Sequence, residues 1–210
     1  MSIFIILLLG FVWYQIIAIF GPTIGLHRYF SHKQFKKVSN TFETISLFLS
    51  MLAGVKSPLG WIGAHRMHHK YSDTKNDPHS PTYKGFWNVF FNNWHIDRIP
   101  KMYIKDILKN PRIMFFHRHW KTIHISFAVI TLLISLEFFL ILVLIPYILG
   151  QIGFGSFNSL GHKDNRPVEN MFINILTAGE GWHDKHHKNP KKIKLDEYDI
   201  SGFIIERYFT

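Results

Sequence analysis

The chain contains no cysteine, and its acidic residues are few. Without Cys the protein can form neither a disulfide framework nor a thiolate metal site, so any metal must take nitrogen and oxygen ligands. Its 24 Lys and Arg outnumber the 14 Asp and Glu, which gives a formal net charge of +10. The 14 His equal the acidic residues in number. Histidine is therefore the main candidate metal ligand.

Charge is missing from two long apolar stretches. No charged side chain occurs from Ser2 to Leu26, and Ile3 to Phe20 is long enough to cross a hydrocarbon layer of about 30 Å. A second apolar region, Ile123 to Phe157, contains Glu137 as its only ionised residue. As one helix it would be about 50 Å long, so we expect two spans with a tight reversal near residues 135–138. The predicted spans are residues 3–22, 123–136 and 138–157.

Lys and Arg are confined to two segments, Arg28 to Lys121 and Lys163 to the end. The positive-inside rule places both in the cytoplasm, which requires one crossing before the first segment and an even number between the two. Three spans satisfy this count, and the interrupted apolar stretch 42–64 then becomes an interfacial or re-entrant segment. A cleaved signal peptide is the alternative for the first run, but that run lacks a basic n-region and a cleavage site. We expect one domain over residues 1–210.

The histidines are grouped in a pattern that predicts two metal ions. Two triplets share the spacing i, i+3, i+4, which places three imidazoles on one helical face. A pair five residues apart is weaker, because its rings lie about 140° apart on a regular helix. Nine imidazoles and one amide exceed the needs of a four-coordinate zinc and suit two ions of coordination number five or six. The candidate ligands are His65, His68 and His69, then His183, His186 and His187, the pair His27 and His32, and Asn158 with His162.

Imidazole suits iron, copper, nickel and zinc, so the spacing leaves the metal open. The remaining histidines lack the triplet spacing, and we interpret them as surface, headgroup-contacting or packing residues: His79, His95, His117, His119 and His124. Glu180 and His183 form one Glu-x-x-His element, but carboxylate di-iron bundles need two copies and further Glu. We therefore expect Glu180 and Asp184 to orient ligands and not to bind metal.

These motifs resemble those of membrane fatty acid desaturases of the delta-9 type. The matching stretches are residues 25–32, 65–73 continuing to 77–81, Asn158 and Ser159 with His162, and 179–187. By analogy with that family, the nine histidines bind two iron ions (Fe2+) directly and Asn158 acts through a water. The resemblance also implies that the chain begins at the family's second transmembrane helix. Residues 61–64 differ from the Arg-Asp pair of animal acyl-CoA enzymes, which leaves the acyl carrier, CoA or membrane lipid, open.

The fold that follows is an all-α integral membrane protein, multi-pass, with a cytoplasmic histidine-rich cap that holds a di-iron site. The resemblance implies an oxygen-dependent acyl desaturase that introduces a cis double bond, expected at the delta-9 position, into a long acyl chain. The chain has no haem, flavin or iron-sulfur motif, so an external donor such as ferredoxin or cytochrome b5 must supply electrons. The basic face is suited to an acidic donor, and we expect no nucleic acid partner.

Two alternatives remain open from the sequence. A membrane di-iron hydroxylase of acyl or alkyl chains would carry the same histidine clusters. A non-catalytic membrane metal-binding or transport protein is the alternative from another class, but it would place ionisable ligands inside its spans. Here the spans contain only Glu137, while the candidate ligands gather at one face.

Overall fold

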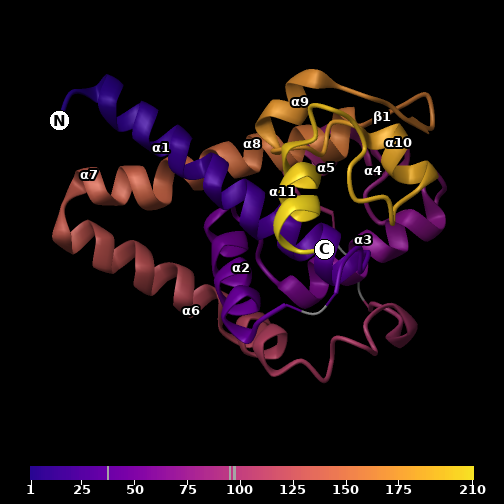
Figure 1. Ribbon diagram of the computed structural model, residues 1–210, viewed down its shortest axis with the longest axis horizontal. Coiled ribbons are helices and arrows are strands. Elements are labelled where there is room, and N and C mark those ends of the chain that lie inside the picture. Colours follow the sequence, from indigo (N-terminus) through magenta and orange to yellow (C-terminus); the bar gives the residue numbers. More distant parts are fainter. Residues whose placement is uncertain (37, 95, 97) are drawn as a thin grey trace.

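Three long helical rods extend from one side of the protein (Figure 1). The first is α1 (Ile3–Ala18), which continues as the π-helix η1 (Ile19–Ser31). The second is α6 (Pro111–Ile134), and the third runs through α7 (Leu136–Phe139), η3 (Leu140–Leu144) and α8 (Ile145–Leu160). This computed structural model describes residues 1–36, 38–94, 96 and 98–210. His95, which the sequence assigns to a surface or packing role, lies outside the described residues.

Two of the rods are long and apolar enough to cross a membrane. They are Ile3–Ser31 and Leu136–Leu160, each of which contains an 18-residue stretch of high mean hydropathy, 2.6 in the first and 2.1 in the second. The third expected span, residues 123–136, is the last half of α6, whose first half is basic and rich in His. Its apolar side chains nevertheless face outward, as Ile125 and Leu133 do at 61% and 81% exposure. The structure thus contains two candidate spans and a third apolar half-helix beside them.

The turn between the second and third rods lies at Ser135, inside the reversal expected near residues 135–138. Ser135 has extended φ and ψ of −166° and 156°, and its Oγ accepts a hydrogen bond from the Phe138 N–H at 3.1 Å. The N-terminal amine of Met1 lies 2.8 Å from Glu137 Oε1. Glu137 is therefore at the tip of the rods, beside the N-terminus, and not midway along a span.

The apolar stretch 42–64 lies in two helices, α2 (Asn40–Leu52) and α3 (Pro58–Tyr71), and the chain reverses its direction between them. Ser39 and Ser57 cap their first turns by accepting from backbone N–H groups. Both helices contact the end of η1. Tyr29 donates to Glu43, in the first turn of α2, at 2.8 Å, and His32 contacts His65 of α3 at 2.7 Å. The segment therefore enters and returns on the same side of the protein.

Small residues allow η1 to lie directly against α2. A Cβ added to Gly25 would be 1.6 Å from Ser46 Oγ, and one added to Gly21 would be 2.7 Å from the Ser50 nitrogen. The largest core cluster forms beside this contact, from Leu26, Phe30, Leu47, Met51, Leu59, Ile62, Ile107, Ile113 and Phe116. This packing fixes the end of η1, and hence its histidines, against α3.

Short elements form the rest of the cap around the ends of the rods (Figure 1). They are α4 (Pro81–Lys84), α5 (Phe86–Phe90), η2 (Lys101–Tyr103), the antiparallel pair β1 (His162–Lys163) and β2 (Arg166–Pro167), α9 (Met171–Leu176), α10 (His183–Lys188) and α11 (Ile200–Tyr208). α5 packs on α8, where Gly155 leaves space for the Phe90 carbonyl. The cap brings α10 next to α3 and η1.

Candidate metal centre

Nine histidines from the end of η1, from α3, from β1 and from α10 converge in two clusters. The five-histidine cluster contains His27, His32, His65, His69 and His186, and the four-histidine cluster contains His68, His162, His183 and His187. In each cluster the candidate ligand atoms lie within 4.8 Å of one another. All nine imidazoles proposed from the sequence are thus brought together.

The two triplets are shared between the clusters. On α3, His65 and His69 face the five-histidine cluster while His68 faces the other one. On α10 the division is reversed, since His186 joins the five-histidine cluster and His183 and His187 join the four-histidine cluster. Each helix therefore serves both clusters, an arrangement that the i, i+3, i+4 spacing alone does not reveal.

The π-helical geometry of η1 brings His27 and His32 to one cluster. On an α-helix these rings would lie far apart in angle, but a π-helix closes its hydrogen bonds between residues five apart. Here the His32 N–H donates to the His27 carbonyl at 3.1 Å, and the two ring centroids are 4.8 Å apart. The wider π-helix therefore lets two histidines five residues apart reach the same cluster, which a regular α-helix would not allow.

The imidazole nitrogens are spaced as ligands of one ion would be. The Nε2 atoms of His27 and His186 are 3.0 Å apart, and those of His32 and His65 are 2.7 Å apart. In the other cluster, His183 Nε2 is 2.8 Å from the Nε2 of His162. A metal–nitrogen bond of about 2.1 Å places neighbouring octahedral ligands about 3.0 Å apart. The spacing fits a metal ion in each cluster.

Three carboxylates, of which Glu180 and Asp77 are buried and Asp73 is partly buried, set the direction of the ligand lone pairs. The Nδ1 atoms of three histidines lie within hydrogen-bond distance of a carboxylate oxygen, His27 of Glu180 at 2.7 Å, His68 of Asp77 at 2.9 Å and His162 of Asp73 at 3.0 Å. Because each Nδ1–H donates to its carboxylate, each Nε2 directs a lone pair inward. Lone pairs that converge at about 3 Å repel one another unless a cation lies between them, so the donor set fits a bound metal.

Asp73 and Asp77 are candidate site residues that the sequence did not indicate. Both lie in the matching stretches after α3, but no spacing rule connects Asp73 with His162, which is 89 residues away. Asp184 was expected to orient a ligand. Among the described residues, its Oδ2 instead accepts a hydrogen bond from Lys188 Nζ at 2.6 Å. The one-turn separation on α10 directs it to Lys188 at the surface.

Burial favours the neutral form of clustered imidazoles on α3 and α10, and this is the form that binds metal. Desolvation lowers the pKa of His187 to about 3, with smaller contributions from neighbouring histidines. Desolvation also lowers the pKa of His65, His68, His183 and His186 well below the ordinary value. The site is therefore prepared for a cation and resists protonation.

The remaining described histidines have packing or hydrogen-bonding partners. His79 stacks on His68 with centroids 4.3 Å apart, and His119 packs on Phe115 at 5.0 Å. The ring of His124 lies 5.5 Å from Tyr147, and His117 Nδ1 lies 2.8 Å from Ser57 Oγ. His79, Asp77 and His68 also form a third group of converging ligand atoms. Since His68 Nδ1 is already bonded to Asp77, this group acts as support for the four-histidine cluster.

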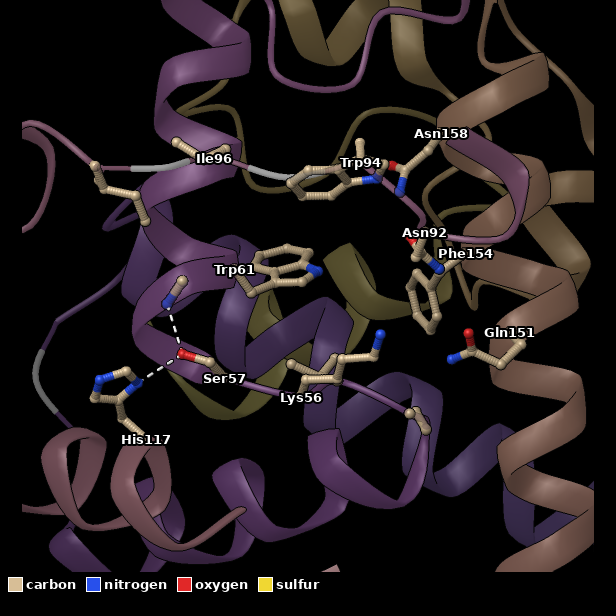
Figure 2. A pocket seen from close by; sticks show the side chains of 15 residues that line it. Lys56, Ser57, Trp61, Asn92, Trp94, Ile96, His117, Gln151, Phe154 and Asn158 are labelled. Carbon is tan, nitrogen blue, oxygen red and sulfur yellow. Dashed lines mark hydrogen bonds between the residues drawn. The ribbon is translucent and has the colours of Figure 1, made fainter. Parts of the chain in front are cut away.

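A cavity of about 510 Å³ has Trp61 in its lining (Figure 2), and this residue separates it from the five-histidine cluster. Trp61, in its wall, stacks on His65 with centroids 5.1 Å apart. Asn158, the tenth ligand proposed from the sequence, lies in the same wall near Trp94. Much of the remaining lining is apolar, from Ala53, Val55, Ile96, Ile99 and Phe154, with Lys56 and Gln151 at one side. The cavity is suited to an apolar group next to a metal.

A sequence model of one family, described as fatty acid desaturase, matches residues 2–195. The chain is 33% identical over 192 residues to an acyl-CoA C20 Delta5-desaturase of Anemone leveillei, a match that covers 84% of this chain and 61% of the relative. It is 32% identical to an sn-1 stearoyl-lipid 9-desaturase of Synechocystis sp., covering 85% and 60%. It is also 28% identical to the Delta(9)-fatty-acid desaturase fat-6 of Caenorhabditis elegans, covering 86% and 60%.

Two clusters of converging histidines joined to apolar rods define a histidine-rich protein with two candidate metal sites and candidate membrane spans. Within that class, the chain belongs to the fatty acid desaturase family, because the family model covers nearly all of it. The chain spans about three fifths of the length of the curated relatives that it matches.

Proposed function

We propose that this protein is a membrane-bound acyl desaturase that introduces a cis double bond, at the delta-9 position, into a long acyl chain. The observation that carries the proposal is the convergence of nine imidazoles in two clusters beside an apolar cavity. Two iron ions held there would supply the dioxygen chemistry by which two hydrogens leave adjacent methylenes, while O2, two electrons and two protons end as two water molecules.

The histidines divide between the two irons as they divide between the clusters. His27, His32, His65, His69 and His186 hold one ion, and His68, His162, His183 and His187 hold the other. Asn158 lines the cavity, where we propose that it acts through a water. Glu180, Asp77 and Asp73 fix the rings of His27, His68 and His162.

The cavity holds the acyl chain. Its volume lies within the range of about 300–1,000 Å³ that is usual for small-molecule sites. An unfunctionalised chain offers no polar group to grip, so the shape of the cavity must decide which carbons lie beside the metals. Trp61 forms the boundary between the cavity and His65, and so sets how closely a methylene approaches the ligands.

The relatives act on more than one acyl carrier and at more than one position. By their names, one is an acyl-CoA Delta5-desaturase and another a stearoyl-lipid 9-desaturase. We propose delta-9 chemistry for this chain because residues 77–81 and the pairing of Asn158 with His162 resemble the delta-9 pattern. The acyl carrier is CoA or a membrane lipid, and an external donor such as ferredoxin or cytochrome b5 provides the electrons.

We also propose a single domain over residues 1–210, with spans at 3–22, 123–136 and 138–157 and the metal site on the cytoplasmic side. The support is that no Lys or Arg precedes Arg28 or lies between Lys121 and Lys163, while the clusters lie with the basic segments. Reporter fusions should place the N-terminus outside the cytoplasm and Lys70 inside. A cytoplasmic N-terminus together with a cytoplasmic Lys70 would contradict the first span.

The test of the activity is expression in a host that lacks its own desaturase, with an electron donor supplied. Mass spectrometry of the fatty acids should find new cis monoenes whose double bond has a fixed distance from the carboxyl end. Comparison of the CoA and lipid pools at early times identifies the carrier. Hydroxy acids without monoenes would show a hydroxylase instead, and a metal-loaded protein without either product would support the non-catalytic alternative.

A further inference from the structure

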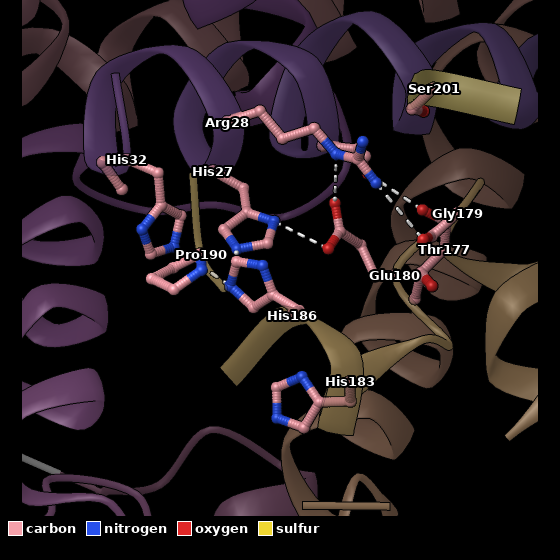
Figure 3. A network of polar contacts seen from close by, with 12 residues as sticks. His27, Arg28, His32, Thr177, Gly179, Glu180, His183, His186, Pro190 and Ser201 are labelled. Carbon is pink, nitrogen blue, oxygen red and sulfur yellow. Dashed lines mark hydrogen bonds and ion pairs between the residues drawn. The ribbon is translucent and has the colours of Figure 1, made fainter. Parts of the chain in front are cut away.

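Arg28 is a buried cation directly next to a proposed metal ligand. It follows His27 on η1, and its residue is only 1% exposed. Nη1 donates to the Ile193 carbonyl at 2.6 Å, and Nη2 donates to the Gly179 carbonyl at 3.3 Å (Figure 3). A guanidinium removed so completely from water requires carboxylate partners, or its desolvation would be strongly unfavourable.

Asp199 is the main partner of Arg28. Its two oxygens accept from Nη1 at 3.1 Å and from Nη2 at 2.9 Å, a bidentate pair. Asp199 is fully buried and also caps α11 by accepting from the Gly202 N–H at 2.8 Å. The family match ends at residue 195, so this carboxylate comes from the segment beyond it. Gly179 is required here, because a Cβ at its φ of +120° would lie 2.8 Å from Asp199 Oδ1.

Glu180 connects the pair to the five-histidine cluster. Its Oε1 lies 3.5 Å from Arg28 Nε, and its Oε2 lies 2.7 Å from His27 Nδ1 (Figure 3). Asp199 occupies the Nη edge of the guanidinium, so Glu180 reaches only Nε. One oxygen of Glu180 is therefore left to hold His27 with Nε2 turned into the cluster.

The charges of these three residues do not balance by themselves. Arg28 carries one positive charge, while Glu180 and Asp199 carry two negative charges, and all three are buried. The excess negative charge is on the carboxylate that faces His27, where a metal cation bound through His27 would neutralise it. A cation held by the five-histidine cluster would therefore balance the charge of the network.

We propose that Arg28 and Asp199 are positioning residues that tune metal binding in the five-histidine cluster through Glu180 and His27. Asp199 restrains Arg28, Arg28 leaves Glu180 available to His27, and the C-terminal helix α11 becomes part of the assembled metal site. This inference rests on the proposed function, in that both clusters bind metal. It assigns to residues 196–210 a role in the chemistry of the site beyond simple packing.

The test compares the metal content of full-length variants purified in detergent. Wild-type protein should bind two Co2+ ions in a spectroscopic titration and carry close to two irons per chain as purified. Arg28→Met, Asp199→Asn and Glu180→Gln should each weaken one of the two Co2+ sites about 10-fold or more, while the second site keeps its affinity. Arg28→Lys, which keeps the charge but loses the bidentate geometry, should give an intermediate affinity.

The matched control is Asp196→Asn. It makes the same change three residues from Asp199, where the carboxylate pairs with Lys185 at 2.6 Å near the surface. Both Co2+ sites should keep the affinity of the wild type.

Unchanged Co2+ affinity in Asp199→Asn and Glu180→Gln would overturn the proposal, and so would equal weakening of both sites in folded protein. If Arg28→Met does not fold, the comparison of Asp199→Asn with Arg28→Lys decides. Wild-type protein that binds no metal would contradict the proposed function. Variants that keep two intact sites would contradict only the role of Arg28 and Asp199.

Discussion

The rods and the cap differ in how their side chains are stabilised. At the tip of the rods, apolar side chains such as Phe4 and Leu133 are exposed at 73% and 81%. In the cap, polar groups such as His65, His162 and Arg28 are buried, and their partners lie 33 residues or more away in the sequence. The rods depend on their surroundings to cover apolar surface, whereas the cap depends on internal charge and hydrogen-bond partners. Changes in the cap should therefore have much larger effects than changes at the tip.

The largest effect should come from removing one ligand of each cluster. The double variant His68→Ala, His186→Ala takes one imidazole from the four-histidine cluster and one from the five-histidine cluster. Because each site then has a gap in its ligand shell, we expect iron in the purified protein to fall to background and acyl products to disappear. His119→Ala, on the exposed face of α6, is the matched control and should keep both irons. Iron that stays at the wild-type level in the double variant would refute the assignment of the metal site.

Acid should affect the cap strongly and leave the rods helical. Burial depresses the pKa of clustered imidazoles such as His65 and His183, so in the folded protein these two stay neutral below about pH 6.5, where the unfolded chain binds protons. This contribution to stability is fully present above that pH and is lost as the pH falls. Released metal and thermal midpoints measured from pH 7.5 to 4.5 should fall together, while the helical circular dichroism of the rods persists. Metal retention that does not change over this range would contradict the burial of neutral ligands.

A smaller effect is expected where the rods enter the cap. Gly25→Ala places a methyl group 1.6 Å from Ser46 Oγ, and such overpacking costs about 1–3 kcal/mol of stability. Thermal unfolding in detergent measures the loss. Adding Ser46→Gly removes the opposing hydroxyl, which has no hydrogen-bond partner among the described residues, and should restore most of the stability. Failure of this second change to restore it would mean that Gly25 matters for a different reason.

The smallest effect should be at the tip. Glu137→Gln removes the ion pair with the Met1 amine, in which both partners are exposed. Pairs of this kind contribute little because water screens them. We expect unchanged metal content and an unchanged thermal midpoint. A clear loss of metal in this variant would contradict the expected difference between the two regions, because it would show that a change at the tip of the rods affects the metal site in the cap.

Local patterns in the sequence were sufficient to indicate the character of both regions. The apolar runs predicted as spans at 3–22 and 138–157 lie within Ile3–Ser31 and Leu136–Leu160, the two helices that are long and apolar enough to cross a membrane, because length and hydropathy are properties of neighbouring residues. The repeated i, i+3, i+4 spacing placed three imidazoles on each of α3 and α10 for the same reason. Family membership followed from these motifs and was confirmed by the match over residues 2–195.

Only the tertiary structure decided how the ligands are shared and held. The division of each triplet between the two clusters depends on how α3 and α10 face each other, and the pairing of His27 with His32 depends on η1 being a π-helix. Asp73 lies 89 residues from His162, and Asp199 lies 171 residues from Arg28. No local period connects residues so distant. Their contacts exist because the rods and the cap pack together, and packing is a property of the whole chain.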